Sequence, residues 1–537
     1  MSSKEDPSIY GEWEPVKYRF QHLPVHTALL STGKVLAFGG SGNDPKHLNN
    51  PYPAEIFEPD DIGKDNGKVY EISNEGIQGD IFCAGHAFLP DGKLLVTGGT
   101  YKYDGAIFGP IPPFSGLEHS YLFDPISLKW TRIQNLKYGR WYPTCIMIPD
   151  GRVVTMAGLT KYLPWLFLNK IEVYSNSGWR VLNGANRWLP LYPRLHLLPT
   201  GEIFYAGSYN THYTFPFSVR AFPSSTLNVE TGKWTSVGNP NNVNREEGTT
   251  VLLPLEPPNY EPRLLLIAGG TPTGNDAISD VEMIDFSEMR PTYRPIQMLK
   301  HARYYVYPVL LPDKTVLVLG GKTGKKGHLH NSSHMDHDHD HDHDHDHDHD
   351  HDHDHDHDHD HHTHPHDIEH HPDAVLAPEL FTPNDRQWKL MADMKVDRLY
   401  HSNALLLPDG RVMTAGSNPH RTINELRIEI FRPPYLFRGD RPIITKYPNN
   451  ISYGSKFELE SPQSKNIIDI ALIRPTVTTH CVNTEQRYVG LEFSSKDSNS
   501  LTVTLPSNKN LVPPGYYLLF ILNNEGVPCI APFVQVL

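Results

Sequence analysis

The chain has 537 residues, of which 38% are apolar and 20% charged, and its formal net charge is −14. Such a length can bury more than one small core. One tract, from Asp336 to His361, alternates Asp and His and contributes 13 of each. Without those acids the net charge is −1, so there is no basic surplus, which excludes nucleic acid as the main partner. No run of 18 apolar residues occurs, which excludes a transmembrane helix and a membrane partner.

The first residues, Met-Ser-Ser-Lys-Glu-Asp-Pro, contain no apolar stretch of the kind that a secretory signal requires. Four cysteines are too few for a disulfide scaffold in a chain of this length. The sequence therefore gives no support for export. We treat residues 1–11 as an N-terminal tail.

From residue 12 onward, short apolar strands that end in Gly-Gly or Ala-Gly recur seven times. Most of them follow a tight turn such as Asp91-Gly92 or Asp409-Gly410, which is a hairpin signal. The glycines that end these strands are Gly40, Gly99, Gly158, Gly207, Gly270, Gly321 and Gly416. A period of about 50 residues with this signature is typical of the kelch type of β-propeller blade. We predict an all-β protein with a seven-bladed kelch propeller over residues 12–431, and a large array of β-sandwiches is the alternative.

The repeat pattern stops after FRPPYLF, residues 431–437. Strand-like runs such as IIDIALIRP and YYLLFILN then alternate with turns to the end of the chain. These features predict that residues 432–537 form a separate immunoglobulin-like β-sandwich.

Reactive side chains recur at one position of the predicted hairpins. Counting back eight residues from the turns at Asp91, Asp150 and Asp409 gives Cys83, Tyr142 and His401, and three other turns give Pro24, Tyr192 and Tyr305. Equivalent blades would place these six residues in a ring at one end of the central channel. Thiolate, imidazole and phenolate are ligands that suit copper. The alternative for each residue alone is ordinary packing, since a buried Cys usually behaves as a small hydrophobe.

Four stretches carry a family resemblance: FCAGHAFLPDG, GRWYPTCIMIPDGRV, RLYHSNALLLPDGRV and RPTVTTHCVNTEQR. They resemble galactose oxidase and glyoxal oxidase, the mononuclear copper-radical oxidases, and the glyoxal-oxidase-like branch in particular. The resemblance covers the chain outside the Asp-His tract. All five site positions of that family have the matching residue type here.

The resemblance implies a role for each residue at these five positions, which are Cys83, Tyr142, Tyr400, His401 and His480. Cys83 would be cross-linked through its sulfur to the ring of Tyr142, which would then be an equatorial copper ligand and the radical carrier. Tyr400 would be the axial tyrosine that accepts the substrate proton. His401 and His480 would be the two imidazole ligands, with His480 on a hairpin that the C-terminal domain sends up the channel.

Two further features concern the substrate. Arg194 matches the arginine that holds a substrate oxygen in these oxidases, and a structural salt bridge is its alternative role. Galactose oxidase has a tryptophan stacked over the cross-link, whereas this chain has Thr160 at that position. Tyr162 and Trp165 are the residues of the same loop that could cover the site. The departure argues against a hexose as substrate.

Between His328 and His371 lie 21 of the 32 histidines. Alternating Asp and His cannot form an apolar core, so we expect this insert, residues 328–371, to be disordered without metal. Its side chains suit Cu(II), Ni(II) or Zn(II). Because it follows Gly321, it should emerge on the copper face, where we hypothesise that it captures copper for the site; a neutral repeat expansion is the alternative.

The sequence and the resemblance together predict a copper-radical oxidase. It would use O2 to oxidise a primary alcohol or a small, glyoxal-type aldehyde and would release hydrogen peroxide. One alternative is a catalytically silent propeller that binds a glycan or a protein, and another is a metal-buffering protein that acts through the Asp-His tract. We expect one copper per chain and a monomer. Without a visible signal the default location is cytoplasmic, although the family is usually secreted or periplasmic.

Overall fold

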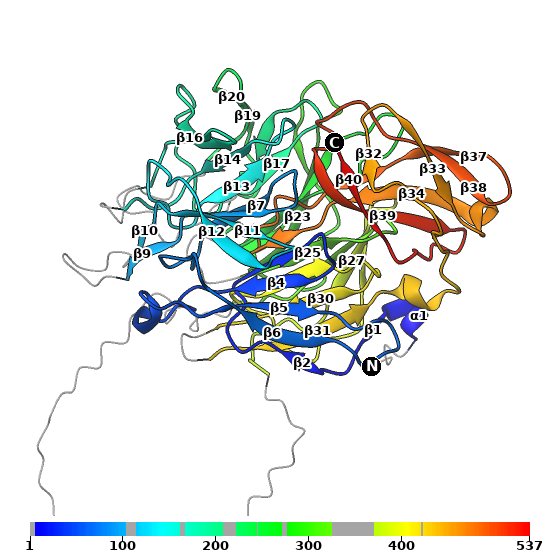
Figure 1. Cartoon of the computed structure of the whole chain (residues 1–537), viewed down its shortest axis with the longest axis horizontal. Helices are drawn as coiled ribbons and strands as arrows, with labels where there is room; N and C mark the ends of the chain where they lie inside the picture. The colour runs from blue at the N-terminus through cyan, green and yellow to red at the C-terminus, as the bar shows by residue number, and fades with distance from the viewer. Residues whose placement is uncertain are drawn as a thin grey trace, which may run out of the picture.

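A computed structural model describes residues 6–103, 114–161, 167–207, 222–243, 245–270, 277–324, 370–419 and 423–537. The described chain is built almost wholly from β-strands, which confirms the all-β class expected from the repeats (Figure 1). Its helical segments are short: α1 (Pro7–Tyr10) and the 3-10 turns η1 (Pro45–His47), η2 (Pro434–Phe437) and η3 (Ser464–Asn466). Within the described ranges, no helix has the length and apolar character needed to span a bilayer.

Each of the seven predicted hairpins supplies two neighbouring strands of one antiparallel sheet. The first sheet contains β3 (His26–Leu29), β4 (Val35–Phe38), β5 (Ala54–Glu58) and β6 (Lys68–Ile72). The second contains β7 (Gly85–Phe88), β8 (Leu94–Thr97), β11 (Ser120–Asp124) and β12 (Lys129–Arg132), beside a ribbon of β9 (Thr100–Tyr103) and β10 (Phe114–Gly116). The third contains β13 (Thr144–Met147), β14 (Val153–Met156), β15 (Glu172–Ser175) and β16 (Gly178–Val181).

The next three sheets repeat this order. The fourth contains β17 (Leu195–Leu197), β18 (Ile203–Tyr205), β19 (Ser224–Asn228) and β20 (Lys233–Gly238). The fifth contains β21 (Thr249–Leu252), β22 (Arg263–Gly270), β23 (Ala277–Asp285) and β24 (Tyr293–Pro295). The sixth contains β25 (Tyr307–Leu310), β26 (Val316–Leu319), β27 (Glu379–Thr382) and β28 (Gln387–Leu390).

The seventh sheet joins the two ends of this region. Its strands β29 (Asn403–Leu406), β30 (Val412–Ala415) and β31 (Arg427–Arg432) pair in sequence order, and β31 also pairs with β1 (Glu12–Trp13) and β2 (Tyr18–Arg19) from the N-terminus. Trp13 lies opposite Phe431, and its indole Nε1 donates to the carbonyl of Ala392 at 2.8 Å. The N-terminal strands β1 and β2 therefore complete the seventh sheet by pairing with β31.

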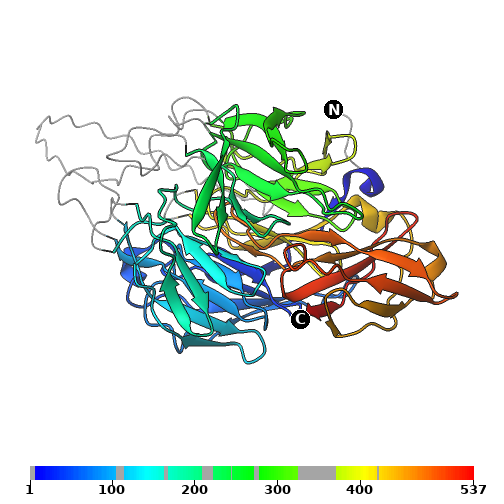
Figure 2. The same cartoon turned by 90° about the horizontal axis from the view of Figure 1, so that it is seen from above.

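Two more sheets form the C-terminal region. One contains β32 (Asn450–Ile451), β40 (Phe533–Val536), β39 (Gly515–Asn523), β34 (Ile467–Ile473) and β36 (Tyr488–Gly490), and the other contains β33 (Lys456–Glu460), β38 (Ser500–Thr504) and β37 (Glu492–Ser495). Figures 1 and 2 show these sheets, coloured orange to red, against one side of the other seven. Between β34 and β36 a hairpin leaves the region, and its strand β35 (Val477–Thr478) pairs with β3 of the first sheet.

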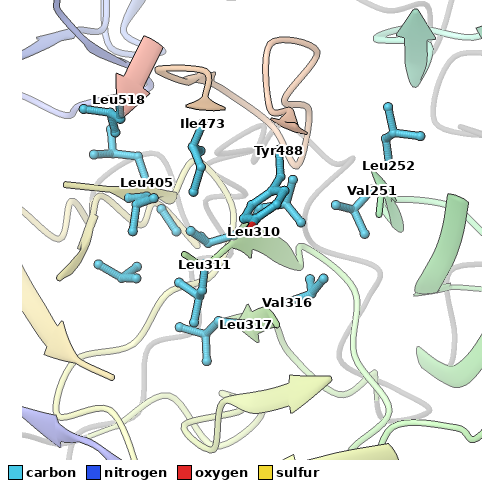
Figure 3. Packing of buried hydrophobic residues seen from close by; sticks show 14 of the residues in the cluster. Val251, Leu252, Leu310, Leu311, Val316, Leu317, Leu405, Ile473, Tyr488 and Leu518 are labelled. Carbon is cyan, nitrogen blue, oxygen red and sulfur yellow. The ribbon is translucent and has the colours of Figure 1, made fainter. Parts of the chain in front are cut away.

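One hydrophobic core joins the C-terminal sheets to the other seven. Leu310 and Leu317 of the sixth sheet and Leu405 of the seventh lie in the same buried cluster as Ile473 and Leu518 of the C-terminal region (Figure 3). All five side chains are at most 1% exposed. Separating the two regions would expose this apolar surface to water, which is unfavourable. The shared core therefore also fixes the hairpin between β34 and β36, whose strand β35 pairs with β3.

A buried ion pair recurs in four of the seven sheets. In each pair a glutamate of the third strand contacts an arginine that lies just before the first strand. The pairs are Arg140–Glu172 at 2.9 Å, Arg245–Glu282 at 2.7 Å, Arg303–Glu379 at 2.8 Å and Arg398–Glu429 at 3.5 Å. The same glutamates accept backbone N–H groups of nearby loops, as Glu379 does from Lys300 and His301. These pairs fix the segment that enters each first strand, where the candidate site residues lie.

Candidate metal centre

The residues that the turn count placed in register share one backbone conformation. Six residues just before a first strand have a positive φ: Cys83 (61°), Tyr142 (63°), Tyr192 (45°), Glu247 (50°), Tyr305 (62°) and His401 (59°). This left-handed conformation is unfavourable for residues other than glycine and tends to occur at functional sites. We call these six the ring residues. Pro24, the predicted member in the first sheet, does not share the conformation because its own ring fixes φ near −65°.

Backbone hydrogen bonds link neighbouring ring residues. The amide of Tyr142 donates to the carbonyl of Cys83 at 3.1 Å, and the amide of Tyr192 donates to Tyr142 at 3.0 Å. In the same way, the amide of Tyr305 donates to Glu247 at 3.0 Å. These bonds join the ring residues of sheets two, three and four in one row and those of sheets five and six in another.

Three potential metal ligands meet in this ring. Single donor atoms of Cys83, His401 and His480 all lie within 4.8 Å of one another, and the three side chains are at most 2% exposed. The Sγ atom of Cys83 is 3.7 Å from Nε2 of His480. His480 comes from the hairpin of the C-terminal region, close to β35, so the pairing of β35 with β3 delivers it to the centre.

The two candidate tyrosines complete the cluster. The hydroxyl groups of Tyr142 and Tyr400 form a hydrogen bond with each other. Tyr400 also stacks on the neighbouring His401 ring, with 3.9 Å between the ring centroids. Tyr142 is 4% exposed, whereas Tyr400 is only partly buried, so Tyr400 is the more accessible of the two phenols. All five residues implied by the family resemblance thus lie together.

A threonine determines which nitrogen of His480 is available. The Thr479 hydroxyl donates its hydrogen to the carbonyl of Val25 at 3.0 Å. It must therefore accept the hydrogen bond from Nδ1 of His480, at 2.6 Å, so that Nδ1 carries the proton. The remaining lone pair is on Nε2, which faces Cys83. Burial lowers the pKa of His480 well below its ordinary value, and the neighbouring His401 adds to this effect, which keeps the ring neutral.

His401 is a buried imidazole whose two ring nitrogens make no hydrogen bond of standard geometry within the described part of the chain, although the Asn418 side chain lies close enough to raise its pKa. The side chain is 1% exposed, and burial lowers its pKa to about 3. Buried polar groups are normally satisfied, so two unsatisfied nitrogens call for a further ligand. A neutral imidazole is the form that binds a metal ion, and copper suits a set of imidazole and phenol ligands. These residues therefore fit a copper ion.

The Cys83 thiol lies beside Tyr142 rather than in solvent. Burial raises its pKa well above the ordinary value, while the hydrogen bond with Tyr142 acts in the opposite direction. The side chain is fully buried, and the backbone amide of Tyr142 donates to the Cys83 carbonyl. The thiol is thus neutral at physiological pH and adjacent to the phenol to which the resemblance would link it.

Arg194 lies two residues after the ring residue Tyr192, and its guanidinium donates hydrogen bonds to the backbone. Nε and Nη2 donate to the carbonyl of Gly248 at 3.1 and 2.8 Å, and Nη1 donates to the carbonyl of Tyr192 at 3.0 Å. Glu247 lies 3.9 Å from Nη2, and Arg194 is 3% exposed. These contacts connect the fourth sheet to the segment that precedes the fifth. The substrate-binding role of Arg194 stays a prediction.

Two residues of the centre were missed from the sequence. Glu247 has the ring conformation in the fifth sheet, but no Asp-Gly turn precedes β22, so the count had no starting point there. The second is Trp141, whose ring stacks on Tyr142 at 3.8 Å and 16°. The alternation of side chains along a strand predicts opposite faces for these neighbours. Tyr162 and Trp165, the predicted covering residues, lie outside the described residues.

The Asp-His tract lies outside the described residues, as does the rest of the insert 328–371 apart from its last two histidines. His370 Nδ1 bonds to Asp397 at 2.8 Å, and the amide of His371 donates to the same carboxylate at 2.6 Å. On the other side of the tract, Lys322 forms bridges with Tyr304 and Ala374. Tyr304 precedes the ring residue Tyr305, so the described ends of the tract join the fold on the side of the metal centre.

Comparisons with known proteins point to the same family as the resemblance. Residues 441–536 match the model of the galactose oxidase-like early set domain, and residues 366–435 match that of the glyoxal oxidase N-terminus. An aldehyde oxidase GLOX of Vitis pseudoreticulata is 26% identical over 98% of this chain and 97% of its own. A galactose oxidase of Gibberella zeae is 24% identical over 98% of this chain and 70% of its own.

A solved structure shares the fold. It is a fungal alcohol oxidase of the AA5 family in complex with copper, with a TM-score of 0.74, 21% identity, and coverage of 98% of this chain and 99% of that chain. These findings confirm the resemblance seen in the sequence: the chain is similar to galactose oxidase and glyoxal oxidase over nearly its whole length. These relatives are named as oxidases of an aldehyde, of galactose and of an alcohol.

Proposed function

We propose that the seven sheets are the blades of a kelch-type propeller over residues 12–431 and that residues 432–537 form an immunoglobulin-like sandwich. The closure of the seventh sheet by β1 and β2 supports the propeller. Contacts between first strands of successive sheets, such as β7 with β13 and β25 with β29, support it further. The channel end of this propeller would carry the ring residues.

The copper ion would be held by His401, His480, Tyr142 and Tyr400. The observation that carries this assignment is the convergence of three sequence-distant segments on one buried cluster with two unsatisfied imidazole nitrogens. Bound copper would supply one-electron redox chemistry. Burial keeps both imidazoles neutral and ready to bind, and Thr479 orients the ring of His480.

Oxidation of an alcohol removes two electrons, so a single copper needs a second redox group. We assign this role to Tyr142 after it has formed a thioether with Cys83. Formation of the carbon–sulfur bond removes the thiol hydrogen and one ring hydrogen with two electrons, which O2 accepts. A sulfur substituent makes the phenol easier to oxidise, and the rigid surroundings mean that little rearrangement accompanies electron loss.

Tyr400 would accept the proton that the substrate hydroxyl releases. It is the more accessible phenol, and its hydrogen bond to Tyr142 places it next to the redox group. A phenol has a high ordinary pKa, and a bound cation lowers that pKa so that the phenolate can act as a base. A substrate oxygen would replace Tyr142 as the hydrogen-bond partner of the Tyr400 hydroxyl group.

The proposed substrate is a primary alcohol or a small aldehyde of the glyoxal type. In each turnover an alcohol, or an aldehyde that has first added water to form its hydrate, would transfer two electrons and two protons to O2, which is released as hydrogen peroxide. Thr160 in place of a loop tryptophan argues against a hexose, and the aldehyde oxidase GLOX that covers the full chain supports an aldehyde. Arg194 donates one N–H of Nη1 and one of Nη2 to backbone carbonyls. The second N–H of each nitrogen would hold a substrate oxygen.

The test is peroxide release by the copper-loaded protein across a panel of aldehydes and primary alcohols. We expect equal amounts of O2 consumed and peroxide formed, and a loss of turnover in Tyr400→Phe with copper still bound. A protein that binds copper but forms no peroxide with any substrate would instead favour the catalytically silent propeller. Metal binding far above one ion per chain without peroxide would favour the metal-buffering alternative.

A further inference from the structure

The ring of Trp141 lies between two other aromatic rings. On one side it faces Tyr142, with 3.8 Å between centroids and 16° between planes, and on the other side it faces Phe114 at 4.3 Å and 9°. Trp141 is 1% exposed, and Phe114 is 6% exposed. The three rings thus form a parallel stack that excludes water from one face of Tyr142.

The backbone explains why adjacent residues can stack. In an extended strand, Trp141 and Tyr142 would point to opposite faces. The positive φ of Tyr142 turns its side chain back toward Trp141, whose backbone exchanges two hydrogen bonds with Leu159 at 3.1 and 2.8 Å. The contact between Trp141 and Tyr142 is therefore set by the backbone at these two residues.

A second ring position has the same arrangement. His401 has a φ of 59°, and the preceding Tyr400 stacks on it at 3.9 Å and 29°. At these two ring positions the preceding ring lies over the ring residue, whereas Tyr304 meets the ring residue Tyr305 edge-on, at 5.0 Å and 76°. In the third sheet that preceding residue is tryptophan, which has the most electron-rich ring among the natural side chains.

We propose that Trp141 is a positioning residue that stabilises the oxidised form of Tyr142 and protects it from solvent. This inference rests on the proposed function. Loss of an electron leaves the Tyr142 ring electron-poor, and a parallel indole face stabilises an electron-poor neighbour by the same attraction that acts in cation–π contacts. Phe114 covers the far face of the indole, so water cannot enter the stack from that side.

Among the described residues, the other aromatic neighbours of Tyr142 are tilted against its ring. Tyr192 and His480 approach the Tyr142 ring at 4.4 and 4.7 Å, but with planes tilted by 31° and 60°. Neither ring is parallel to Tyr142. Among the described residues, Trp141 has the parallel contact and therefore the largest overlap with the oxidisable ring.

The decisive variant is Trp141→Phe, which keeps a flat ring in the stack but makes it less electron-rich. Trp141→Leu removes the ring, and Tyr192→Phe is the control, since it alters a tilted neighbour of Tyr142. Each protein is loaded with copper, and its cross-link is counted by intact mass. It is then oxidised with hexacyanoferrate(III), and we measure the midpoint potential and the half-life of the oxidised protein by absorbance and electron paramagnetic resonance.

We expect the cross-link to form in all of these proteins. The half-life should fall about tenfold in Trp141→Leu and less in Trp141→Phe, with a raised potential in both. A half-life and potential in Trp141→Phe equal to those of the unmodified protein would overturn the inference. If the unmodified protein forms neither cross-link nor oxidised species, the proposed function fails, and this inference fails with it.

Discussion

The hydroxyl groups of Tyr142 and Tyr400 are hydrogen-bonded although 258 residues separate them in the chain. One precedes the third sheet and the other precedes the seventh, and each is held by the left-handed turn that opens its sheet. His480 reaches the same point from the C-terminal region. The metal centre thus exists only when three distant parts of the fold are assembled.

Thr479 should control copper affinity through His480. Thr479→Val removes the acceptor of the Nδ1 proton and should lower copper affinity about 10- to 100-fold. The matched control is Thr27→Val, because Thr27 is a buried threonine on β3 whose hydroxyl has no partner within the described chain. Copper affinities of the two variants can be compared by competition with a chelator. Equal affinity in both would contradict the assigned tautomer.

Breaking one repeated ion pair should cost more stability than breaking an exposed one. Arg303→Met leaves Glu379 buried without its partner and should lower the free energy of unfolding by about 3–5 kcal/mol. Arg294→Met breaks the exposed pair with Glu288 and should cost at most about 1 kcal/mol. Urea unfolding measures both changes. Similar losses in the two variants would show that the buried pair has no special role.

Asp80 should make the fold less stable as the pH rises. Burial raises its pKa from 3.8 to about 7, so between these values the folded chain keeps a proton that the unfolded chain releases. The free energy of unfolding should therefore fall across this window, by about 4 kcal/mol in total. In Asp80→Asn the side-chain oxygen can still accept from Ser41 and Phe82, and the decline should disappear.

Asp124 serves as a control for Asp80, because its pKa is shifted in the opposite direction. The backbone N–H of Ser127 donates to this carboxylate and lowers its pKa, so its contribution to stability is lost as the pH falls. Asp124→Asn should thus remove a decline at low pH. Unfolding curves between pH 3 and 8 separate the two effects, and an unchanged pH profile in Asp80→Asn would contradict the assigned pKa.

The Asp-His tract should speed the loading of copper when the metal is scarce. Its described ends, at Lys322 and His370, join the fold on the side of the metal centre, so copper bound there would be close to the site. Deleting residues 334–369 keeps His370 and His371 on Asp397. We expect slower loading at limiting copper and equal loading at excess copper. Equal rates at limiting copper would leave the tract as a neutral repeat expansion.

Much of the centre could be predicted because a short-range signal marks it. The turn at Asp150-Gly151 sets the register of the third hairpin, and eight residues earlier lies Tyr142, as in the other sheets. Glu247 was not predicted as a ring residue because the loop before β22 has no Asp-Gly turn from which to count. The contact of Trp141 with Tyr142 was not predicted because the side chains of neighbouring residues do not alternate across a residue with positive φ, such as Tyr142. The backbone contacts of Arg194 depend on the neighbouring sheet, which the sequence does not reveal.

The most direct test of the copper-radical site is the intact mass of the protein after aerobic loading with copper. We predict the loss of two hydrogen atoms in the unmodified protein and no loss in Cys83→Ser, with peptide mapping that joins Cys83 to Tyr142. Cys145→Ser, which changes another buried thiol, should keep the loss. An unmodified protein that binds copper and retains its full mass would contradict the radical mechanism.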